Sequence, residues 1–100
     1  MLNMELITDN DKGELKLIGW LDASNAADAE ASMVQAAERF DTIIVDLAAL
    51  EYVSSAGLRA LKMLYLTMRR KGGKLLVKNV TKPIMEVFEY TGFAAMIKFI

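Results

Sequence analysis

The chain opens with apolar and polar residues in alternation and then changes to apolar residues at helical spacing. Residues 4–7 are predicted to form a short strand, and residues 14–20 alternate at first, which is typical of a half-buried strand. Turn-forming residues 10–13 lie between them. The two strands are predicted to pair as an antiparallel hairpin. Residues 42–47 form an apolar run with one late acid, which indicates a central strand or one covered on both faces. Residues 74–77 are predicted to form the next strand.

Two long segments carry the three- and four-residue apolar spacing of helices that pack on a sheet. Asn25 is placed to cap the first helix, and Ser54 or Ser55 is placed to cap the second. Gly72 is placed to end the second helix, because glycine accepts the left-handed conformation found after a last turn. The apolar positions of the two helices are Ala26, Ala29, Met33, Ala36, Ala37 and Phe40, and then Leu58, Leu61, Tyr65 and Met68.

A third helix opens at Pro83, which a first helical turn tolerates, and ends at Gly92. Residues 48–53 are predicted to be a loop, and residues 95–100 a last, short strand. This alternation of strands and helices after a hairpin predicts one α/β domain over residues 1–100. We expect a mixed, partly parallel sheet of about five strands with about three flanking helices.

Composition removes several classes of function. The chain has 12 basic and 13 acidic residues and a net charge of -1, which does not point to nucleic acid as a direct partner. Cysteine and histidine are absent, so a thiol nucleophile and a Ser-His-Asp triad are excluded within this chain. There is no signal peptide pattern and no apolar run of the ~20 residues that span a bilayer. We therefore expect a cytoplasmic protein without a membrane span.

Ser54 and Ser55 lie where a strand hands over to a helix. A hydroxyl there can cap the helix, and a phosphate there meets free backbone N–H groups. From position alone, a plain helix cap and a phosphorylated docking point both remain open. Gly57 has two explanations as well, since close packing on a strand and the close approach of a partner each require a residue without a side chain.

Acidic residues are the remaining candidates for chemistry. We expect Asp22, Asp46 and Glu51 near one end of the sheet, where paired carboxylates bind magnesium or act as acid and base. Caps and solvated loop acids explain them as well, and their spacing matches no ligand set. We therefore predict no catalytic residue, no metal ligand and no cofactor.

Basic residues concentrate in the middle of the chain, from Arg59 to Lys74. Such a run suits a solvated helix face or a surface for an acidic partner. The two glycines of Lys71-Gly72-Gly73-Lys74 follow a helix and precede a strand. A phosphate-binding loop has the opposite order, so these glycines are interpreted as a helix stop.

The stretch Val53-Ser54-Ser55-Ala56-Gly57-Leu58 resembles the signature loop of the STAS family, in particular of bacterial anti-sigma factor antagonists. The preceding run Ile43-Ile44-Val45-Asp46-Leu47 is similar to the family's signature strand. The segment from Gly19 to Ala26 resembles its "G-x-L-D…N" segment, and the later Lys71-Gly72-Gly73-Lys74 and Thr91-Gly92-Phe93 match further landmarks. The order and spacing of these pieces cover nearly the whole chain.

The resemblance implies a binding module without catalysis. In the family, an antagonist binds an anti-sigma factor that is also a serine kinase, and thereby frees the sigma factor. Phosphorylation of a loop serine ends the complex, and a phosphatase, here expected to be of the PP2C type, restores it. The family's phosphorylated serine lies two residues before the loop glycine, which is Ser55 in this chain. The partner surface implied here is Asp22, Ser24, Asn25, Ser54, Ser55, Gly57 and Arg59.

The chain departs from the family's pattern at two places. Many members carry an acid immediately before the phosphorylated serine, where this chain has Ser54, so Ser54 is the second choice for modification and the first for capping. Many members also continue into a final helix, and the surface under that helix is here expected to be exposed or covered in a homodimer. The alternative function is a STAS module of another assembly, such as a stressosome-like scaffold, a lipid or anion transporter complex or a nucleotide sensor.

Overall fold

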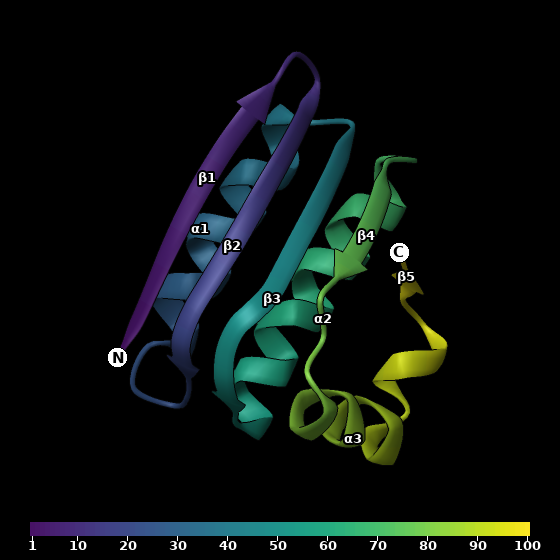
Figure 1. Cartoon of the computed structure of the whole chain (residues 1–100). Helices are drawn as coiled ribbons and strands as arrows, with labels where there is room; N and C mark the ends of the chain where they lie inside the picture. The colour runs from purple at the N-terminus through teal and green to yellow at the C-terminus, as the bar shows by residue number, and fades with distance from the viewer.

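The computed structural model describes all 100 residues as a mixed sheet with three α-helices and a single-turn 3-10 helix (Figure 1). In chain order the elements are β1 (Leu2–Asp9), β2 (Lys12–Leu21), α1 (Ala26–Arg39), β3 (Thr42–Val53), α2 (Ser55–Arg70), β4 (Lys74–Lys78), α3 (Lys82–Thr91), the 3-10 helix η1 (Phe93–Ala95) and β5 (Lys98–Phe99). The α/β architecture expected from the sequence, a mixed sheet of five strands with three α-helices, is confirmed.

The sheet has five strands in the order β1-β2-β3-β4-β5, so β3 is central as its apolar run predicts. β1 and β2 pair antiparallel with Leu6 opposite Leu15, which confirms the predicted hairpin. β2 pairs parallel with β3, β3 with β4, and β4 with β5. Because parallel strands end at the same edge, the segments that follow β2 and β3 lie together.

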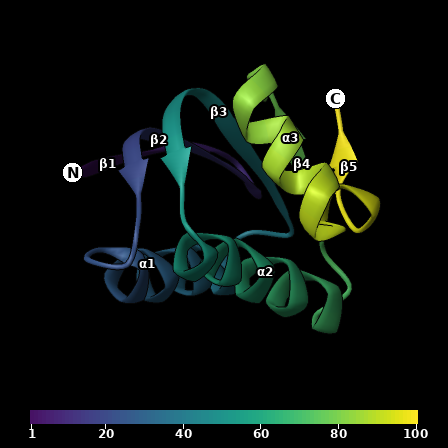
Figure 2. The same ribbon diagram turned by 90° about the horizontal axis from the view of Figure 1, so that it is seen from below.

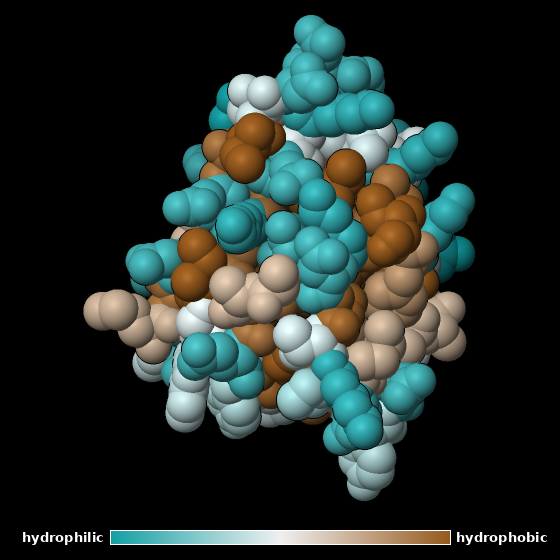
Figure 3. Space-filling model, viewed as in Figure 1, coloured by the Kyte–Doolittle hydropathy of each residue, from teal (hydrophilic) through white to brown (hydrophobic).

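The helices divide the two faces of the sheet unequally. Figure 2 shows α1 and α2 side by side under one face, while α3 lies apart from them beside β3 and β4. The core lies between the sheet and the two paired helices, with Leu17, Met33 and Leu64 fully buried. The other face, here called the open face, shows polar and apolar side chains interspersed (Figure 3).

The prediction of a loop over residues 48–53 is wrong, because β3 continues to Val53. Two register shifts against β2 give β3 an extra residue each time, which is the pattern of β-bulges. Each bulge adds one residue between side chains that face the core, so Leu47, Leu50 and Val53 are buried three positions apart instead of two. The sequence therefore loses its strand-like alternation while the strand itself goes on.

The last predicted strand is also shorter than expected. Residues 93–95 form η1, and only Lys98–Phe99 pairs with β4. Phe93 is buried and its ring lies edge-on to that of Phe88, 4.9 Å between centroids. Packing of this aromatic pair holds the chain in a helical turn before it returns to the sheet.

Candidate functional site

The turn from β3 into α2 is held by two hydrogen bonds around Ser54. The Ser54 N–H donates to the carbonyl oxygen of Leu21 over 2.9 Å, which ties the turn to the end of β2. The Ser54 Oγ accepts from the Gly57 N–H over 3.1 Å. Ser54 is therefore the N-cap of α2, as predicted, and its hydroxyl is engaged in the fold.

Gly57 is explained by packing, not by the approach of a partner. A Cβ atom at this position would lie 2.6 Å from the Leu21 carbonyl oxygen and 2.7 Å from the Leu21 Cγ. Gly57 is buried, so its assignment to the partner surface is corrected. The glycine lets the start of α2 press against the end of β2 and thereby fixes where the two serines lie.

Ser55 differs from Ser54 both in exposure and in its role at the helix start. It is the first residue of α2, it is exposed, and it does not cap the helix. The N–H groups of Ser55 and Ala56 have no acceptor within the chain, because a first helical turn lies beyond the reach of the helix's own carbonyls. An exposed hydroxyl thus stands beside free donors at the positive end of a helix dipole.

The loop between β2 and α1 lies at the same edge of the sheet and is tied within itself. The Asp22 Oδ1 accepts from the Ser24 hydroxyl over 2.6 Å and from the Ser24 N–H over 3.0 Å. Asn25 occupies the N-cap position of α1 but its side chain does not cap the helix. It accepts from the Asp22 N–H and donates to the Trp20 carbonyl, so it shapes the loop instead.

These contacts change the acidity of Asp22. The hydrogen bond from the Ser24 hydroxyl, with smaller contributions from backbone donors and the positive chain terminus, lowers the pKa of Asp22 below its ordinary value. The carboxylate is therefore charged at neutral pH and bound to its own loop. It presents a fixed negative charge beside the start of α2.

Arg59 lies one turn along α2 from Ser55, and both line a groove of about 500 Å³ between α2 and the end of α3. Both residues are exposed. The β2–α1 loop with Asp22 and Ser24 and the start of α2 with Ser55 and Arg59 follow paired strand ends, which the Ser54 N–H joins through its bond to the Leu21 carbonyl. Their assignment to a partner surface stays a prediction.

An aromatic pair at this end was missed from the sequence. Trp20 and Tyr52 lie opposite each other in β2 and β3, with ring centroids 5.0 Å apart and exposed fractions of 49% and 44%. The Trp20 Nε1 donates to the Glu51 carboxylate over 3.3 Å. Each aromatic residue comes two positions before the segment that follows its strand, but their pairing depends on the extension of β3 to Val53, which the sequence pattern does not reveal.

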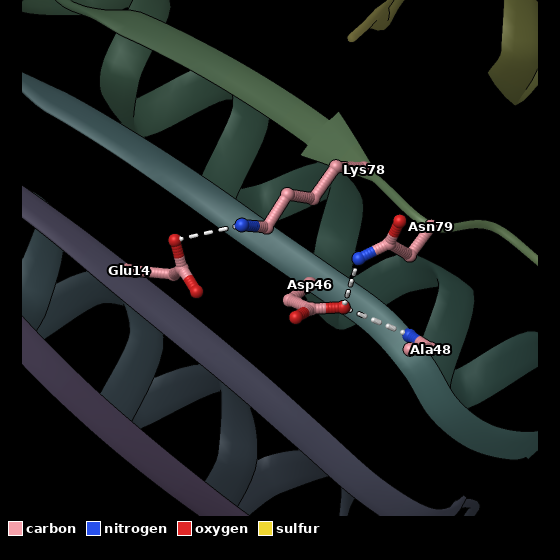
Figure 4. Close-up of polar contacts among 5 residues, drawn as sticks. All are labelled: Glu14, Asp46, Ala48, Lys78 and Asn79. Carbon is pink, nitrogen blue, oxygen red and sulfur yellow. Dashed lines mark hydrogen bonds and ion pairs between the residues drawn. The ribbon is translucent and has the colours of Figure 1, made fainter.

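Asp46 does not lie at this end of the sheet, because β3 runs on past it. Its Oδ1 accepts from the Ala48 N–H over 3.0 Å and from the Asn79 Nδ2 over 3.1 Å (Figure 4). The expectation that Asp46 joins Asp22 and Glu51 is therefore wrong. Its carboxylate takes up the N–H group that the first β-bulge turns away from β2.

Burial by itself raises the pKa of Asp46, but the neighbouring hydrogen-bond donors and ammonium groups have the larger combined effect. The bonds from Ala48 and Asn79 and the nearby ammonium groups of Lys78 and Lys16 lower the pKa of Asp46 below its ordinary value. Lys78 also forms a salt bridge of 3.0 Å with Glu14, which completes a polar strip across the open face (Figure 4). The hydrogen bonds and the salt bridge of this cluster are thus all formed within the chain.

The glycines after α2 act as a helix stop, as predicted. Lys71 is the C-cap residue of α2, and Gly72 follows with a φ of 76°, the left-handed conformation that favours glycine. The Lys71 Nζ donates to the carbonyl oxygens of Ala37 and Phe40 at the end of α1. This lysine therefore stabilises the fold and does not contribute to a phosphate-binding loop.

Neither a membrane-spanning helix nor a metal-binding group of side chains is found in the structure. No helix combines the length and the apolar character needed to cross a bilayer. No three His, Cys, Asp or Glu side chains gather closely enough to hold a metal ion.

Comparison with known proteins identifies the family of the chain. A family model described as the STAS domain matches residues 3–100. The chain belongs to the STAS family. Among curated STAS relatives it is 31% identical over 96 residues to BtrV of Bordetella bronchiseptica, a candidate anti-sigma factor antagonist, and the match covers 93% of this chain and 83% of that protein.

Solved structures of anti-sigma factor antagonists share the fold at lower identity. A candidate anti-sigma factor antagonist of Thermotoga maritima gives a TM-score of 0.88 at 15% identity, with 96% of this chain and 84% of that one covered. An anti-sigma factor antagonist of Mycobacterium paratuberculosis gives 0.86 at 18% identity, covering 99% and 85%. The Bacillus cell fate determinant SpoIIAA in its phosphorylated form gives 0.76 at 18% identity, covering 100% and 91%.

Proposed function

We propose that this STAS protein is an anti-sigma factor antagonist whose partner is an anti-sigma factor with serine kinase activity. Binding the partner frees a sigma factor for transcription, and phosphorylation of Ser55 ends the complex. A phosphatase of the PP2C type reverses the modification. The protein acts in the cytoplasm by binding and carries out no catalysis of its own.

The observation that carries this proposal is the difference between the two adjacent serines. Ser54 is committed to the helix through its bond with the Gly57 N–H. Ser55 is exposed and stands beside the unpaired N–H groups of the first turn of α2. A kinase reaches Ser55 without disturbing the cap. The similar fold of SpoIIAA, which is known in phosphorylated and unphosphorylated forms, supports the same reading.

Electrostatics explains how a phosphate on Ser55 would break a complex without changing the fold. The group adds about −1.5 to −2 charges at pH 7. In the free protein the N–H groups of Ser55 and Ala56 and the helix dipole stabilise that charge. Inside a packed contact the same charge is desolvated, and Asp22 and Glu51 carry like charge nearby. A penalty of ~3 kcal/mol weakens binding roughly a hundredfold.

The proposed contact surface surrounds Ser55 on both loops of this sheet end. Asp22 and Ser24 present the β2–α1 loop, and Arg59 extends the surface along α2. Trp20 and Tyr52 add an exposed aromatic pair of the kind that carries much of the energy in protein interfaces. Asn25 and Ser54 support these loops from within.

Co-purification with the ATP-binding anti-sigma factor encoded nearest in the genome tests the proposal. Wild type and Ser55→Ala are expected to bind that protein, and Ser55→Asp is expected to bind about a hundredfold more weakly. Ser32→Asp, at an exposed serine of α1, is the matched control and is expected to bind as wild type does. If Ser55→Asp binds like this control, phosphorylation control is wrong and a STAS module with a constant contact in another assembly is favoured.

Mass spectrometry of the protein from its native cell separates the two serines. Phosphate is expected on Ser55, because Ser54 must give up its bond to the Gly57 N–H before it can be modified. Phosphate on Ser54 alone would reassign the switch.

A further inference from the structure

Helix α2 carries a second stripe of side chains that are not buried in the core, although Leu58 packs against the edge of the core. The core stripe is Gly57, Ala60, Leu61, Leu64 and Met68. The second stripe recurs at the same three- and four-residue steps and consists of Ser55, Leu58, Arg59, Lys62, Met63 and Leu66. Three of these six residues are apolar and only half-buried. A helix that serves the sheet alone would be polar at such positions.

The second stripe forms one wall of a groove, here called the α2–α3 groove. The opposite wall is built by Thr91, Gly92, Phe93 and Met96, from the end of α3 and the η1 turn. The open volume is about 500 Å³, and the wall on α2 extends from Ser55 to Leu66. At 1.5 Å per residue this length is about 16 Å, or about three helical turns.

The groove is positively charged at its rim. Arg59 and Lys62 are exposed, and no acidic side chain lines the groove. Neither cation is paired within the chain, since the sole salt bridge joins Lys78 and Glu14 on the open face. An apolar floor with unpaired cations along one rim is complementary to an apolar stripe flanked by carboxylates.

We propose that the α2–α3 groove receives an acidic amphipathic helix of the anti-sigma partner. Leu58, Leu66 and Met96 contact the apolar stripe of that helix, and Arg59 and Lys62 pair with its carboxylates. This proposal rests on the proposed function and extends it by naming the chemistry of the partner's segment.

Ser55 stands at the mouth of this groove, which connects docking to the switch. Ser55 and Arg59 are four residues apart and lie on the same face of α2. A phosphate on Ser55 pairs with Arg59 and removes one of the two cations that attract the partner's carboxylates. The same phosphate repels those carboxylates directly. Phosphorylation therefore weakens binding both at the loop and along the groove.

Charge reversal in the groove tests the proposal with the partner used above. Arg59→Glu and Lys62→Glu are each expected to weaken binding about tenfold or more, because like charges then face each other. Arg70→Glu is the matched control on the same helix, exposed but outside the groove, and is expected to bind within about twofold of wild type. The loss is expected to shrink as salt concentration rises.

Two outcomes of that experiment have different meanings. If Ser55→Asp weakens binding while both groove variants match Arg70→Glu, the groove proposal is overturned and the proposed function stands. If no variant and no wild-type protein binds the anti-sigma factor, the proposed function fails, and the groove is then decided by the peptide measurement that follows.

Nuclear magnetic resonance with synthetic helical peptides provides that independent measurement. The probe has leucine at positions i, i+3, i+4 and i+7 and glutamate on its other face, and the matched peptide has lysine in place of glutamate. Only the glutamate peptide is expected to shift the resonances of Leu58, Leu66 and Met96, and Arg59→Glu is expected to remove that shift. Equal shifts with the lysine peptide, shifts with ATP alone, or concentration-dependent burial of these residues in a dimer would each overturn the proposal.

Discussion

Strand β3 has two regions without regular pairing, the bulge beside Asp46 and the turn into α2 at its end. Polar groups find partners within the chain in the first region and remain partly unpaired in the second. At the Asp46 bulge, the displaced Ala48 N–H and the Asn79 side chain both find the same carboxylate oxygen. At the end of the strand, Ser54 satisfies the Gly57 N–H while Ser55 and its backbone N–H remain exposed to solvent. The first region forms its hydrogen bonds within the chain and stabilises the fold, and the second leaves the N–H groups of Ser55 and Ala56 without an acceptor in the chain.

The largest expected loss of stability comes from changing Gly57, which packs the start of α2 against the end of β2. Gly57→Val places a branched side chain where even a Cβ would lie 2.6 Å from the Leu21 carbonyl oxygen. We expect a loss of about 3 kcal/mol in the free energy of unfolding, at the upper end of overpacking effects. Urea denaturation measures it, with Ala56→Val as the neighbouring control. Equal midpoints for the two variants would contradict the close packing.

Removing the Asp46 carboxylate from the bulge is expected to lower the free energy of unfolding somewhat less. Asp46→Ala removes the acceptor of both the Ala48 N–H and the Asn79 amide. The free energy of unfolding is expected to fall by about 2 kcal/mol, because a partly buried donor then lacks its partner. The same urea titration checks this, and binding of the anti-sigma factor by the folded variant is expected to be unchanged. A binding defect at full stability would move Asp46 into the functional surface.

The pH dependence of stability isolates the charge of this cluster. Because the pKa of Asp46 is lowered in the folded protein, its charge stabilises the fold above the unfolded-state value of about 3.9 and this contribution is lost as pH falls through the folded-state value. Asp46→Asn keeps an acceptor oxygen but does not titrate. Its stability is expected to fall less steeply than that of wild type below about pH 4. Parallel acid curves for the two proteins would contradict this role.

Removing the cap from the second region is expected to have a smaller effect. Ser54→Ala leaves the Gly57 N–H without its acceptor and should cost about 1 kcal/mol of unfolding free energy. Ser54→Asp, which keeps a capping oxygen, should recover most of that loss. Thermal unfolding compares the two. If the alanine and aspartate variants unfold together, the Ser54 hydroxyl does not stabilise the helix.

The smallest effect on stability is expected at the adjacent residue. Ser55→Ala removes an exposed hydroxyl that does not cap the helix, so the free energy of unfolding should change by no more than about 0.5 kcal/mol. The same substitution should abolish kinase-dependent phosphorylation completely. Phosphate incorporation by the partner kinase, measured beside unfolding, checks both. A stability loss as large as that of Ser54→Ala would give Ser55 a structural role.

Local chemistry accounts for the features that the sequence predicts correctly. Ser54 caps α2 and Gly72 ends it, because a cap or a left-handed residue acts within four positions of the helix end. The hairpin of β1 and β2 follows from alternation on either side of a turn. The loop motif around Ser55 contributes to the family resemblance for the same reason, since its residues are contiguous.

The errors arise where distant segments decide the outcome. Residues 48–53 look like a loop because two bulges interrupt their alternation, yet pairing with β2 keeps them in the sheet. For the same reason the sequence pattern places Asp46 at a strand end, whereas it lies within β3, and its partner Asn79 is remote in sequence. The aromatic pair of Trp20 and Tyr52 could not be expected without the β3 extension.

The sequence by itself therefore determined the α/β class, the helix boundaries and the two serines at the start of α2, since all of these depend on period and on neighbours along the chain. The tertiary structure decided which serine is free, because the end of β2 fixes Ser54 through the Leu21 carbonyl and buries Gly57 against it. It also decided that Asp46 belongs to the fold and that a basic groove extends from Ser55 along α2. Those features depend on contacts between strands and helices that are far apart in the sequence, so the local pattern of residues does not predict them.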